Sequence, residues 1–489
     1  MEPDYQIGII GAGFAGLVAA LRLKKQQRES FVIFERAAEV GGTWRDNVYP
    51  GCACDVASPL YSFADEPNPD WANLFATQPD ILAYMKQVVN RNELTNHIRF
   101  NTDVVQAEFV TGQGCWQVTD ARGSTITVKV LLSALGPLNR PNIPNFKGLS
   151  GFQGKIMHTA EWDTSYDLTN KTVAVIGTGA SAVQLIPNIA PQTKHLTVFQ
   201  RTPAWISHRR DRTFSETAQQ RFRRFPSLMK LLRESVFWLS ELVGHGFTGA
   251  GWLNKIMKQL SLNKLANEVR DPEIRAKLTP QYTIGCKRIL KSDDFYPTFN
   301  RSNVDLITDP IDGFTKTGIR TVDGQEHAVD VVIMGTGFRV ADLNFYTKFT
   351  GKDGKHLLDV WKQTGGQAYK GVTVAGFPNL AFLLGPNTGL GHNSVVHIME
   401  SQMNYIMHYI DQIERLGETG YLDVAESTQK SYNERLQAQF AGTVWSSGCQ
   451  SWYMNEEGKN TTLYPRLNTH FRRLTKHFAL SDYQVVNSL

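Results

Sequence analysis

The sequence predicts an α/β fold built from two Rossmann-like units with a helical insertion. In two separate regions an apolar strand leads into a glycine-rich turn and then into a helix, which is the order of a Rossmann unit. The expected strand and helix pairs are 6–10 with 17–25, and 171–176 with 181–189. Between residues 213 and 277 the strand signal disappears and the leucine spacing becomes helical, which predicts the insertion.

The composition is that of a globular protein. The chain has 489 residues, 42% of them hydrophobic and 20% charged, and it is long enough to bury a large core. These values exclude fibrous, disordered and disulfide-scaffold proteins. Since the sequence has no run of about 18 uncharged apolar residues, we expect no stable membrane insertion. The net charge of +5 is small and no nucleic-acid recognition motif accompanies the basic runs, so we expect no nucleic-acid partner.

Further elements are expected along both units. In the first unit a helix at 80–94 stands among strands at 31–34, 97–100, 104–109, 116–119 and 126–132. The second unit is expected to contain strands at 196–199, 304–307 and 329–334, and a strand at 380–384 and a helix at 394–416 follow it. Residues 136–151 are rich in Pro, Asn and Gly and are interpreted as a linker.

The first turn has the sequence GAGFAG. Gly11 permits the tight turn, Gly13 lets the backbone approach a pyrophosphate, and Gly16 lets the helix pack closely on the strand. The N–H groups at the start of the helix attract phosphate. Glu35 lies 24 positions after Gly11, at the end of the next strand, where a carboxylate accepts hydrogen bonds from ribose hydroxyls. These features predict a site for a ribose without a 2′-phosphate, which we assign to FAD.

The second turn, GTGASA, has a different neighbour. Gly177, Gly179 and Ala182 occupy its three small-residue positions. The residue 24 positions after Gly177 is Arg201, which follows Gln200. A carboxylate here would repel a 2′-phosphate, whereas arginine binds it with two parallel hydrogen bonds. We therefore assign this site to NADPH, with an ordinary surface charge as the alternative for Arg201.

The cysteines bear on the fate of the electrons. Flavin disulfide reductases use a pair close in sequence, such as C-x-x-C, and the spacing of Cys52 and Cys54 does not fit that pattern. All five cysteines are therefore expected to be buried structural thiols. The odd, sparse count indicates a reducing compartment, and a first strand at residue 6 leaves no room for a signal peptide, so we expect a cytoplasmic location. The other three cysteines are Cys115, Cys286 and Cys449.

A longer motif favours oxygen activation. Residues 152–163 read FQGKIMHTAEWD, with His158 and Trp162 at the positions that characterise the motif. The segment resembles the F-x-G-x-x-x-H-x-x-x-W-[PD] fingerprint of type I Baeyer–Villiger monooxygenases, which are class B flavoprotein monooxygenases of the flavin-containing monooxygenase superfamily. Related flavin-containing monooxygenases have serine after the histidine, where this chain has Thr159.

Several other segments extend the resemblance over most of the chain. Residues 41–55 match the family pattern G-G-x-W-x-x-x-x-Y-P-G-x-x-x-D, in which Gly42, Thr43 and Trp44 are expected at the FAD. A core tryptophan is an equal alternative for Trp44. Further matches occur at 200–203, 285–288, 299–304 and 335–337.

The resemblance implies an activity and a catalytic pair. Such an enzyme uses FAD and NADPH to insert one atom of O2 next to a ketone carbonyl, through a C4a-peroxyflavin, and releases an ester or lactone. Arg288 matches the active-site arginine of the family, and Asp55 matches the carboxylate that orients it. A permanent cation suits this step because negative charge develops on oxygen. For Arg288 and Asp55, the alternative role is an ordinary ion pair. For the protein, the alternative functions are S- or N-oxygenation of soft nucleophiles such as sulfides, or a flavoprotein that binds its cofactors without turnover.

The resemblance also assigns further residues. Lys287 matches a lysine that contacts the 2′-phosphate together with Arg201, and Asn387 precedes the long helix whose N-terminus is expected near the flavin ring. His158 is either a proton relay or, as we favour, a linker residue that couples cofactor binding to domain rotation. Trp452 is expected to reach substrate and nicotinamide. The remaining residues assigned to cofactor binding or coupling are Thr202, Thr336, Gly337 and Trp162. No metal-ligand spacing is recognisable, so we expect no metal site.

We expect three folded units. The FAD domain comprises 1–140 and 341–489, the NADPH domain 141–212 and 282–340, and a helical subdomain 213–281. Substrate is expected in the crevice between the nucleotide domains. Within the helical insert, the apolar residues at 237–239 and 252–253 have three interpretations: an interdomain core, which we prefer, an access route, or a membrane-surface helix.

Overall fold

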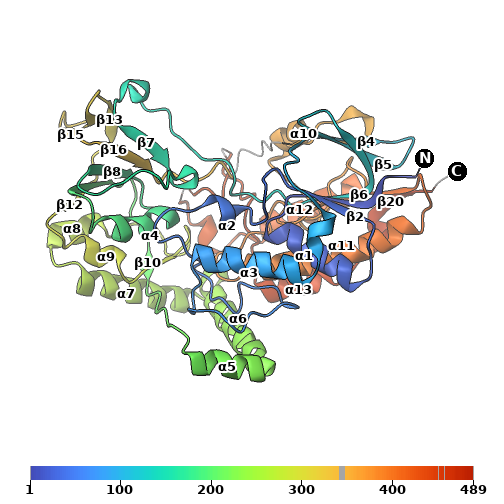
Figure 1. Cartoon of the computed structure of the whole chain (residues 1–489), viewed down its shortest axis with the longest axis horizontal. Helices are drawn as coiled ribbons and strands as arrows, with labels where there is room; N and C mark the ends of the chain where they lie inside the picture. The colour runs from blue at the N-terminus through green and yellow to red at the C-terminus, as the bar shows by residue number, and fades with distance from the viewer. Residues whose placement is uncertain (1, 341–346, 450, 456, 488–489) are drawn as a thin grey trace.

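Two mainly parallel β-sheets, each covered by helices, organise the molecule (Figure 1). The structure is a computed structural model that describes residues 2–340, 347–449, 451–455 and 457–487. The predicted α/β fold class with two Rossmann-like units is confirmed. The expected start of the second FAD segment, residue 341, lies outside the described residues.

The first sheet has eight strands from distant parts of the chain. Its order is β17-β4-β5-β6-β1-β2-β3, with β18 paired to β6, and β1 pairs in parallel with both β2 and β6. Helices α1, α3 and α11 share a core with one face, and β18 brings the C-terminal part of the chain to the sheet. The elements are β1 Tyr5–Ile10, α1 Phe14–Lys25, β2 Phe31–Phe34, α3 Gln78–Arg91, β3 Ile98–Arg99, β4 Val104–Val110, β5 Cys115–Asp120, β6 Thr125–Ser133, β17 Lys348–Thr350, β18 Leu380–Phe382 and α11 Val395–Glu414.

The central strands of this sheet are buried on both faces. Ile7 and Ile9 of β1 pack with the helices, whereas Ile10 packs on the opposite side with Trp116 and Phe382. This explains why 6–10 and 31–34 read as continuous apolar runs rather than as an alternating pattern.

The second sheet is entirely parallel, with the order β12-β9-β8-β16-β7. Helix α4 packs on one face, and an antiparallel sheet of three strands shares a core with the other. The elements are β7 Lys155–His158, β8 Thr172–Ile176, α4 Ala180–Ile189, β9 His195–Phe199, β12 Val304–Ile307, β13 Ile311–Phe314, β14 Gly318–Thr321, β15 Glu326–Ala328 and β16 Val331–Met334.

Strand β7 corrects the sequence interpretation of His158. We placed this residue in a linker, but it ends β7 and lies opposite Met334 of β16. The four residues of β7 are too few to show an alternating pattern, so only their pairing with β16 identifies them as a strand.

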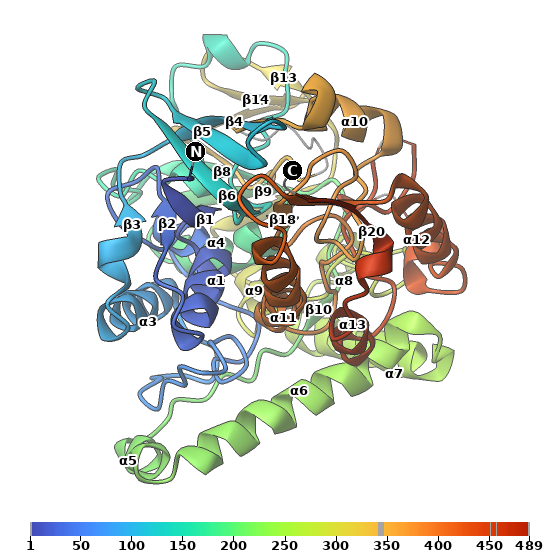
Figure 2. The same ribbon diagram turned by 90° about the vertical axis from the view of Figure 1, so that its right-hand side faces the viewer.

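In the predicted helical insertion, α5, α6 and α7 form an outer layer along the lower edge of the molecule (Figures 1 and 2). Helix α6 packs against α11, one of the helices that cover the first sheet, and Phe237 stacks there on His397. Helix α7 contributes Leu265 to the core of the second sheet. The interdomain-core interpretation is wrong for Trp238, Leu239 and Trp252, which are exposed. The helices are α5 Glu216–Arg224, α6 Pro226–Thr248, α7 Gly251–Glu268 and α8 Pro272–Lys277.

The connection between the sheets consists of two chain segments side by side. The Asn142 amide donates to the Gly337 carbonyl at 2.9 Å, and the Arg339 amide donates to the Arg140 carbonyl at 2.9 Å. Among the described residues, no helix combines the length and the apolar character needed to cross a membrane. Other elements are α2 Thr43–Asp46, β10 Ile206–Ser207, β11 Leu290–Lys291, α9 Phe295–Thr298, α10 Leu357–Thr364, β19 Tyr421–Val424, α12 Glu426–Ala438, α13 Asn468–Thr475 and β20 Tyr483–Val486.

Candidate active site

The backbone of the first glycine turn packs too closely for side chains at Gly11 and Gly16. Gly11 has a φ of +105°, and a Cβ placed there would lie 2.7 Å from the Ala134 carbonyl oxygen. A Cβ on Gly16 would lie 1.9 Å from the Gly11 oxygen, so helix and turn touch through backbone alone. Gly13 precedes α1 without a side-chain cap in the described chain, and it faces Gly42 across the turn. The arrangement suits a pyrophosphate at the start of α1.

Glu35 is buried against this turn. Its Oε2 accepts from the Ala12 amide at 2.9 Å, and its Oε1 accepts from the Ala37 amide at 3.0 Å and from Arg45 at 2.8 Å. Three donors orient the carboxylate at the end of β2, where the ribose contact was predicted.

The neighbouring α2 carries Thr43 and Trp44. The Thr43 carbonyl accepts from the Asn47 side chain at 2.9 Å. The Trp44 indole donates to the Tyr61 hydroxyl at 3.0 Å. The ring packs against the cores of both sheets, so it is a contact between the units of the first and second sheets.

The second turn repeats the backbone geometry but is more open. Gly177 has a φ of +106°, and a Cβ there would lie 2.5 Å from the Gly335 oxygen. A Cβ on Gly179 would meet no heavy atom of the described chain within 4 Å, which leaves space in front of α4. Ala182 is fully buried, and the Thr178 hydroxyl donates to the Thr202 carbonyl at 3.2 Å.

Two cations meet beside the second turn. Arg201 is exposed after β9, and burial together with the positive charge of Arg201 lowers the pKa of Lys287. The Lys287 amine lies 5.0 Å from the centre of the Tyr282 ring. Since two like charges repel, an anion bound beside both of them lowers the energy of the arrangement, as the predicted 2′-phosphate contact requires.

Arg288 and Asp55 form the predicted pair. The guanidinium donates to both carboxylate oxygens of Asp55, with Nε–Oδ2 at 2.9 Å and Nη2–Oδ1 at 2.5 Å. Burial alone would raise the pKa of Asp55, but the charges of Arg288 and Lys291 lower it overall. The carboxylate in turn raises the pKa of Arg288. The shifts therefore favour the charged form of each partner, a guanidinium and a carboxylate. The pair is oriented by two hydrogen bonds and is only partly exposed to solvent.

Helix α4 positions the loop that carries Asp55. The Gln184 amide donates to the Ala53 carbonyl at 2.9 Å, and its oxygen accepts from the Tyr49 hydroxyl at 2.9 Å. Cys54 of this loop belongs to the core of the first sheet and α4 belongs to the core of the second, so the units of the two sheets meet at this site.

Two residues beside the pair were not predicted. The Lys291 amine lies 5.0 Å from the centre of the Phe75 ring and interacts electrostatically with Asp55 and Arg288, while burial lowers its pKa. Tyr453 is buried, and its burial raises its pKa to about 12 although Arg288 acts in the opposite sense. Lys291 lies on a strand of two residues, too short for a periodic signal.

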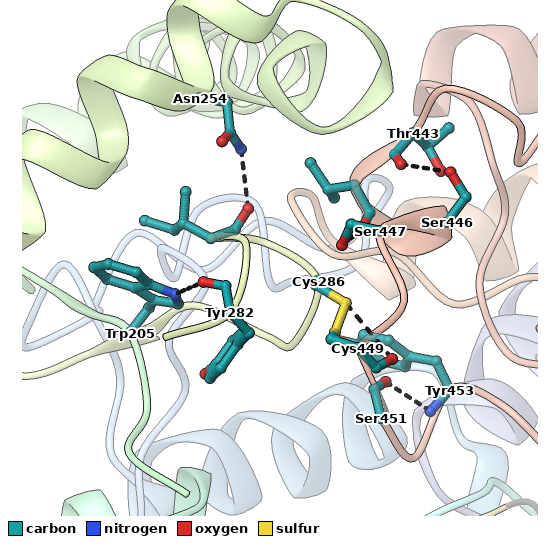
Figure 3. Close-up of a disulfide and its surroundings, with 12 residues drawn as sticks. Trp205, Asn254, Tyr282, Cys286, Thr443, Ser446, Ser447, Cys449, Ser451 and Tyr453 are labelled. Carbon is teal, nitrogen blue, oxygen red and sulfur yellow. Dashed lines mark hydrogen bonds between the residues drawn. A yellow bond between two sulfur atoms is a disulfide. The ribbon is translucent and has the colours of Figure 1, made fainter. Parts of the chain in front are cut away.

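Figure 3 shows a disulfide between Cys286 and Cys449, whose Cα atoms are 6.4 Å apart. The prediction of free thiols is wrong for this pair, because its members are 163 residues apart and meet only in the tertiary structure. The other three cysteines are free and buried, as predicted. The bond joins the segment of Lys287 and Arg288 to the segment of Tyr453.

The remaining predicted residues are dispersed. His158 is buried at the carboxyl ends of the strands of the second sheet, where the second turn also begins. Strand β16 lies between its strand β7 and β8, the strand that leads into the second turn. Burial lowers its pKa, an effect that Glu161 and the backbone of Gly337 partly offset. The lowered pKa favours the neutral form of the histidine. Trp162 is half-buried against the second core. Trp452 is 46% exposed and contacts the Tyr453 ring, with centroids 4.4 Å apart.

Thr336 and Asn387 both hold backbone segments. The Thr336 hydroxyl donates to the Asn142 carbonyl at 2.5 Å, in the connection between the two sheets. The buried Asn387 amide donates to the Asn460 and Leu463 carbonyls at 2.8 and 2.9 Å. Helix α11 begins only at Val395, so its N-terminus does not directly follow Asn387.

Comparison with known proteins identifies the family. A family model described as flavin-binding monooxygenase-like matches residues 4–348. The chain belongs to this family. A Baeyer-Villiger monooxygenase of Pseudomonas aeruginosa is 45% identical over 485 residues, which cover 99% of this chain and 92% of the relative. Another of Streptomyces coelicolor is 42% identical over 482 residues, covering 98% and 92%.

Solved structures agree with this membership. The closed crystal structure of cyclohexanone monooxygenase has a TM-score of 0.88 and 28% identity, and the match covers 100% of both chains. A complex of OTEMO with FAD and NADP has a TM-score of 0.89 and 27% identity, covering 99% of this chain and 100% of the other. The family predicted from the fingerprint is confirmed.

Proposed function

We propose that this protein is a FAD- and NADPH-dependent Baeyer–Villiger monooxygenase. It inserts one atom of O2 next to a ketone carbonyl and forms an ester or lactone. The observation that carries the proposal is the Arg288–Asp55 pair, held between two nucleotide-binding turns of different charge. The names of the relatives support the same activity.

The two turns fit the two cofactors. A bare turn in which Gly13 faces Gly42, next to an oriented Glu35, suits the pyrophosphate and ribose of FAD. The open space at Gly179 and the cations Arg201 and Lys287 suit NADPH. We assign FAD to Gly11, Gly13, Gly16, Glu35, Gly42, Thr43, Trp44, Asp55 and Asn387, and NADPH to Gly177, Gly179, Ala182, Arg201, Thr202, Lys287, Thr336 and Gly337.

We also propose the division into a FAD domain (1–140 and 341–489), an NADPH domain (141–212 and 282–340) and a helical subdomain (213–281). The two separate sheets and the paired connection at 140–142 and 337–339 support this division. His158 and Trp162 are proposed to couple the domains. A cytoplasmic location stays a prediction, and the Cys286–Cys449 bond removes the cysteine count as its support.

The residues of the site act by orientation and charge. When bound, FAD supplies the activation of oxygen. Arg288 stabilises the negative charge that develops on oxygen as it adds to the ketone carbonyl, and Asp55 holds the guanidinium in place with two hydrogen bonds. Lys291 adds a second positive charge nearby. Because these groups are partly shielded from water, their charges act more strongly than they would at the surface.

Product analysis with labelled oxygen tests the proposal. The FAD-loaded enzyme, NADPH and ¹⁸O2 are incubated with a ketone and, separately, with a sulfide. We expect an ester that contains one ¹⁸O atom. A sulfoxide without any ester would instead identify an S-oxygenating enzyme, and NADPH oxidation without either product would refute both activities.

A further inference from the structure

The helical insert exposes an apolar surface that the proposed reaction does not use. On α6 the exposed apolar residues are Leu228, Leu231, Trp238, Leu239 and Leu242. On α7 they are Trp252, Ile256 and Leu260. All eight side chains are between 41% and 65% exposed, and we call them the outer stripe.

The outer stripe of α6 lies on one face of the helix. At about 100° per residue, its five positions fall within roughly a third of the helix circumference. Positions 229, 233, 237 and 241 lie on the opposite face and point into the protein. Isolated exposed apolar residues are ordinary on a protein surface, but a continuous stripe marks an interaction site.

Polar contacts fix the inward face and prevent the helix from turning over. Arg233 donates to Glu400 of α11 at 3.1 Å and to three carbonyls of the 59–62 segment. The buried Glu241 carboxylate accepts from Asn393 at 2.9 Å and from the Thr469 hydroxyl at 2.8 Å. Burying the outer stripe against the body of this chain would break these bonds, so the stripe is available to a partner.

The charge of the insert determines the chemistry of that partner. Residues 213–281 contain eleven basic and six acidic side chains, a net charge of +5 that equals the charge of the whole chain. Exposed basic residues stand next to the stripe, on α6 at Lys230, on α7 at Lys255 and Lys258, and at the end of α5 at Arg221 and Arg224. A second copy of this chain would bring like charges together, whereas an anionic bilayer offers negative headgroups above an apolar interior.

We propose that the α6–α7 pair docks on the surface of an anionic lipid bilayer. The helices lie in the interface without crossing it, and the leucines enter the acyl boundary while Lys and Arg contact the headgroups. The exposed Trp238 and Trp252 supply the indole rings that favour a membrane–water interface.

The docked face is connected to the active site. The Asn254 side chain of α7 donates to the Ile284 carbonyl at 2.9 Å, four residues before Arg288 (Figure 3). Phe247 at the end of α6 packs over Gly285. A docked insert therefore places the site close to apolar compounds dissolved in the bilayer. The docking itself does not depend on the proposed reaction.

Vesicle flotation tests the proposal with the full-length, FAD-loaded protein. Vesicles of phosphatidylglycerol and phosphatidylcholine at 30:70 are compared with vesicles of phosphatidylcholine alone. We expect at least fivefold more protein on the anionic vesicles at low salt, and a loss of most of this difference at high salt.

Two double variants separate apolar from charged contributions. Leu231→Gln with Leu239→Gln keeps the charge and should lower anionic-vesicle binding at least fivefold. Lys255→Gln with Lys258→Gln keeps the stripe and should reduce the preference for anionic vesicles. Val322→Gln is the matched control, because Val322 is a comparably exposed apolar residue in the β14–β15 turn, outside the insert. Flavin content and circular dichroism verify folding.

The alternatives give distinct results. If the wild-type protein does not float with anionic vesicles, or if the leucine double variant floats as well as wild type, the proposal is refuted. A dimer by light scattering that the leucine variant dissociates, combined with no vesicle binding, would identify the stripe as a self-association surface and would also refute it.

Discussion

The two glycine-rich turns have nearly the same backbone but different chemistry around them. The φ values of Gly11 and Gly177 differ by only one degree. Beside the first turn lies the buried Glu35 carboxyl group with three donors, and beside the second lie Arg201 and Lys287. The shared backbone recognises a pyrophosphate, and the residue at the end of the following strand determines which dinucleotide is accepted.

The turns also differ in how tightly helix and turn pack. Gly16 and Ala182 occupy corresponding positions, but only the second turn accommodates a methyl group. The first turn is therefore less tolerant of substitution than the second.

The largest expected effect comes from exchanging these two residues. In Gly16→Ala the new Cβ would lie 1.9 Å from the Gly11 oxygen, so the turn must shift. We expect loss of FAD and destabilisation by more than about 3 kcal/mol. Ala182→Gly should cost only about 1 kcal/mol and leave FAD in place. Flavin content and urea unfolding measure both. Equal effects of the two substitutions would show that the turns do not differ in packing.

Ester formation at the site between the units of the two sheets should depend strongly on Arg288. Arg288→Ala should lower ester formation about 100- to 1000-fold, the usual effect of removing one donor to a developing oxyanion. Flavin reduction by NADPH should persist, because both glycine turns are intact. Arg320→Ala is the control, since Arg320 makes a similar two-bond pair with Asp312 at the surface. Ester formation that survives in Arg288→Ala would contradict the assigned role.

The C-terminal part of the chain also holds the insert in a pH-dependent way, through the contacts of His392, Asn393 and Thr469 with Glu241. Burial opposes its ionisation, but hydrogen bonds from His392, Thr469 and Asn393 lower the pKa of Glu241 to about 2, from 4.5. A carboxylate with a depressed pKa stabilises the fold above its unfolded pKa and loses this contribution as the pH falls. The stability advantage over Glu241→Gln, up to about 3 kcal/mol, should therefore decline from pH 4.5 towards 2. Urea unfolding at several pH values measures it, and an advantage that does not change between pH 6 and 3 would exclude this linkage.

The smallest effect is expected at the cations of the second turn. Lys287→Ala should raise the KM for NADPH about tenfold, which corresponds to about 1.4 kcal/mol, and leave the KM for NADH nearly unchanged. Arg201→Ala should act in the same direction, because both groups are assigned to the 2′-phosphate. Steady-state kinetics with both cofactors measures the preference. An unchanged preference in both variants would mean that the second turn does not distinguish the two cofactors by charge.

Local patterns were sufficient for much of the fold. Strands β2 and β12 have the expected bounds, and both glycine turns lie between a strand and a helix. The continuous apolar runs predicted buried strands because residues on both faces contact helices or a second layer. The edge strand β7 was not anticipated, and an exposed apolar surface on the insert was one of three interpretations but not the preferred one. A four-residue strand has no readable period, and a leucine-rich helix reads the same whether its apolar face is covered or exposed.

By itself the sequence determined the two nucleotide turns, their opposite charges and the fingerprint between them. These features depend on residues within about 25 positions of one another, where backbone restrictions and apolar periodicity act locally. Only the tertiary structure decided the contacts of the site. Arg288 and Asp55 are 233 residues apart, and Cys286 and Cys449 are 163 apart. Their distances, like the approach of Lys291 to Asp55, follow from how the two sheets pack, which no local pattern specifies.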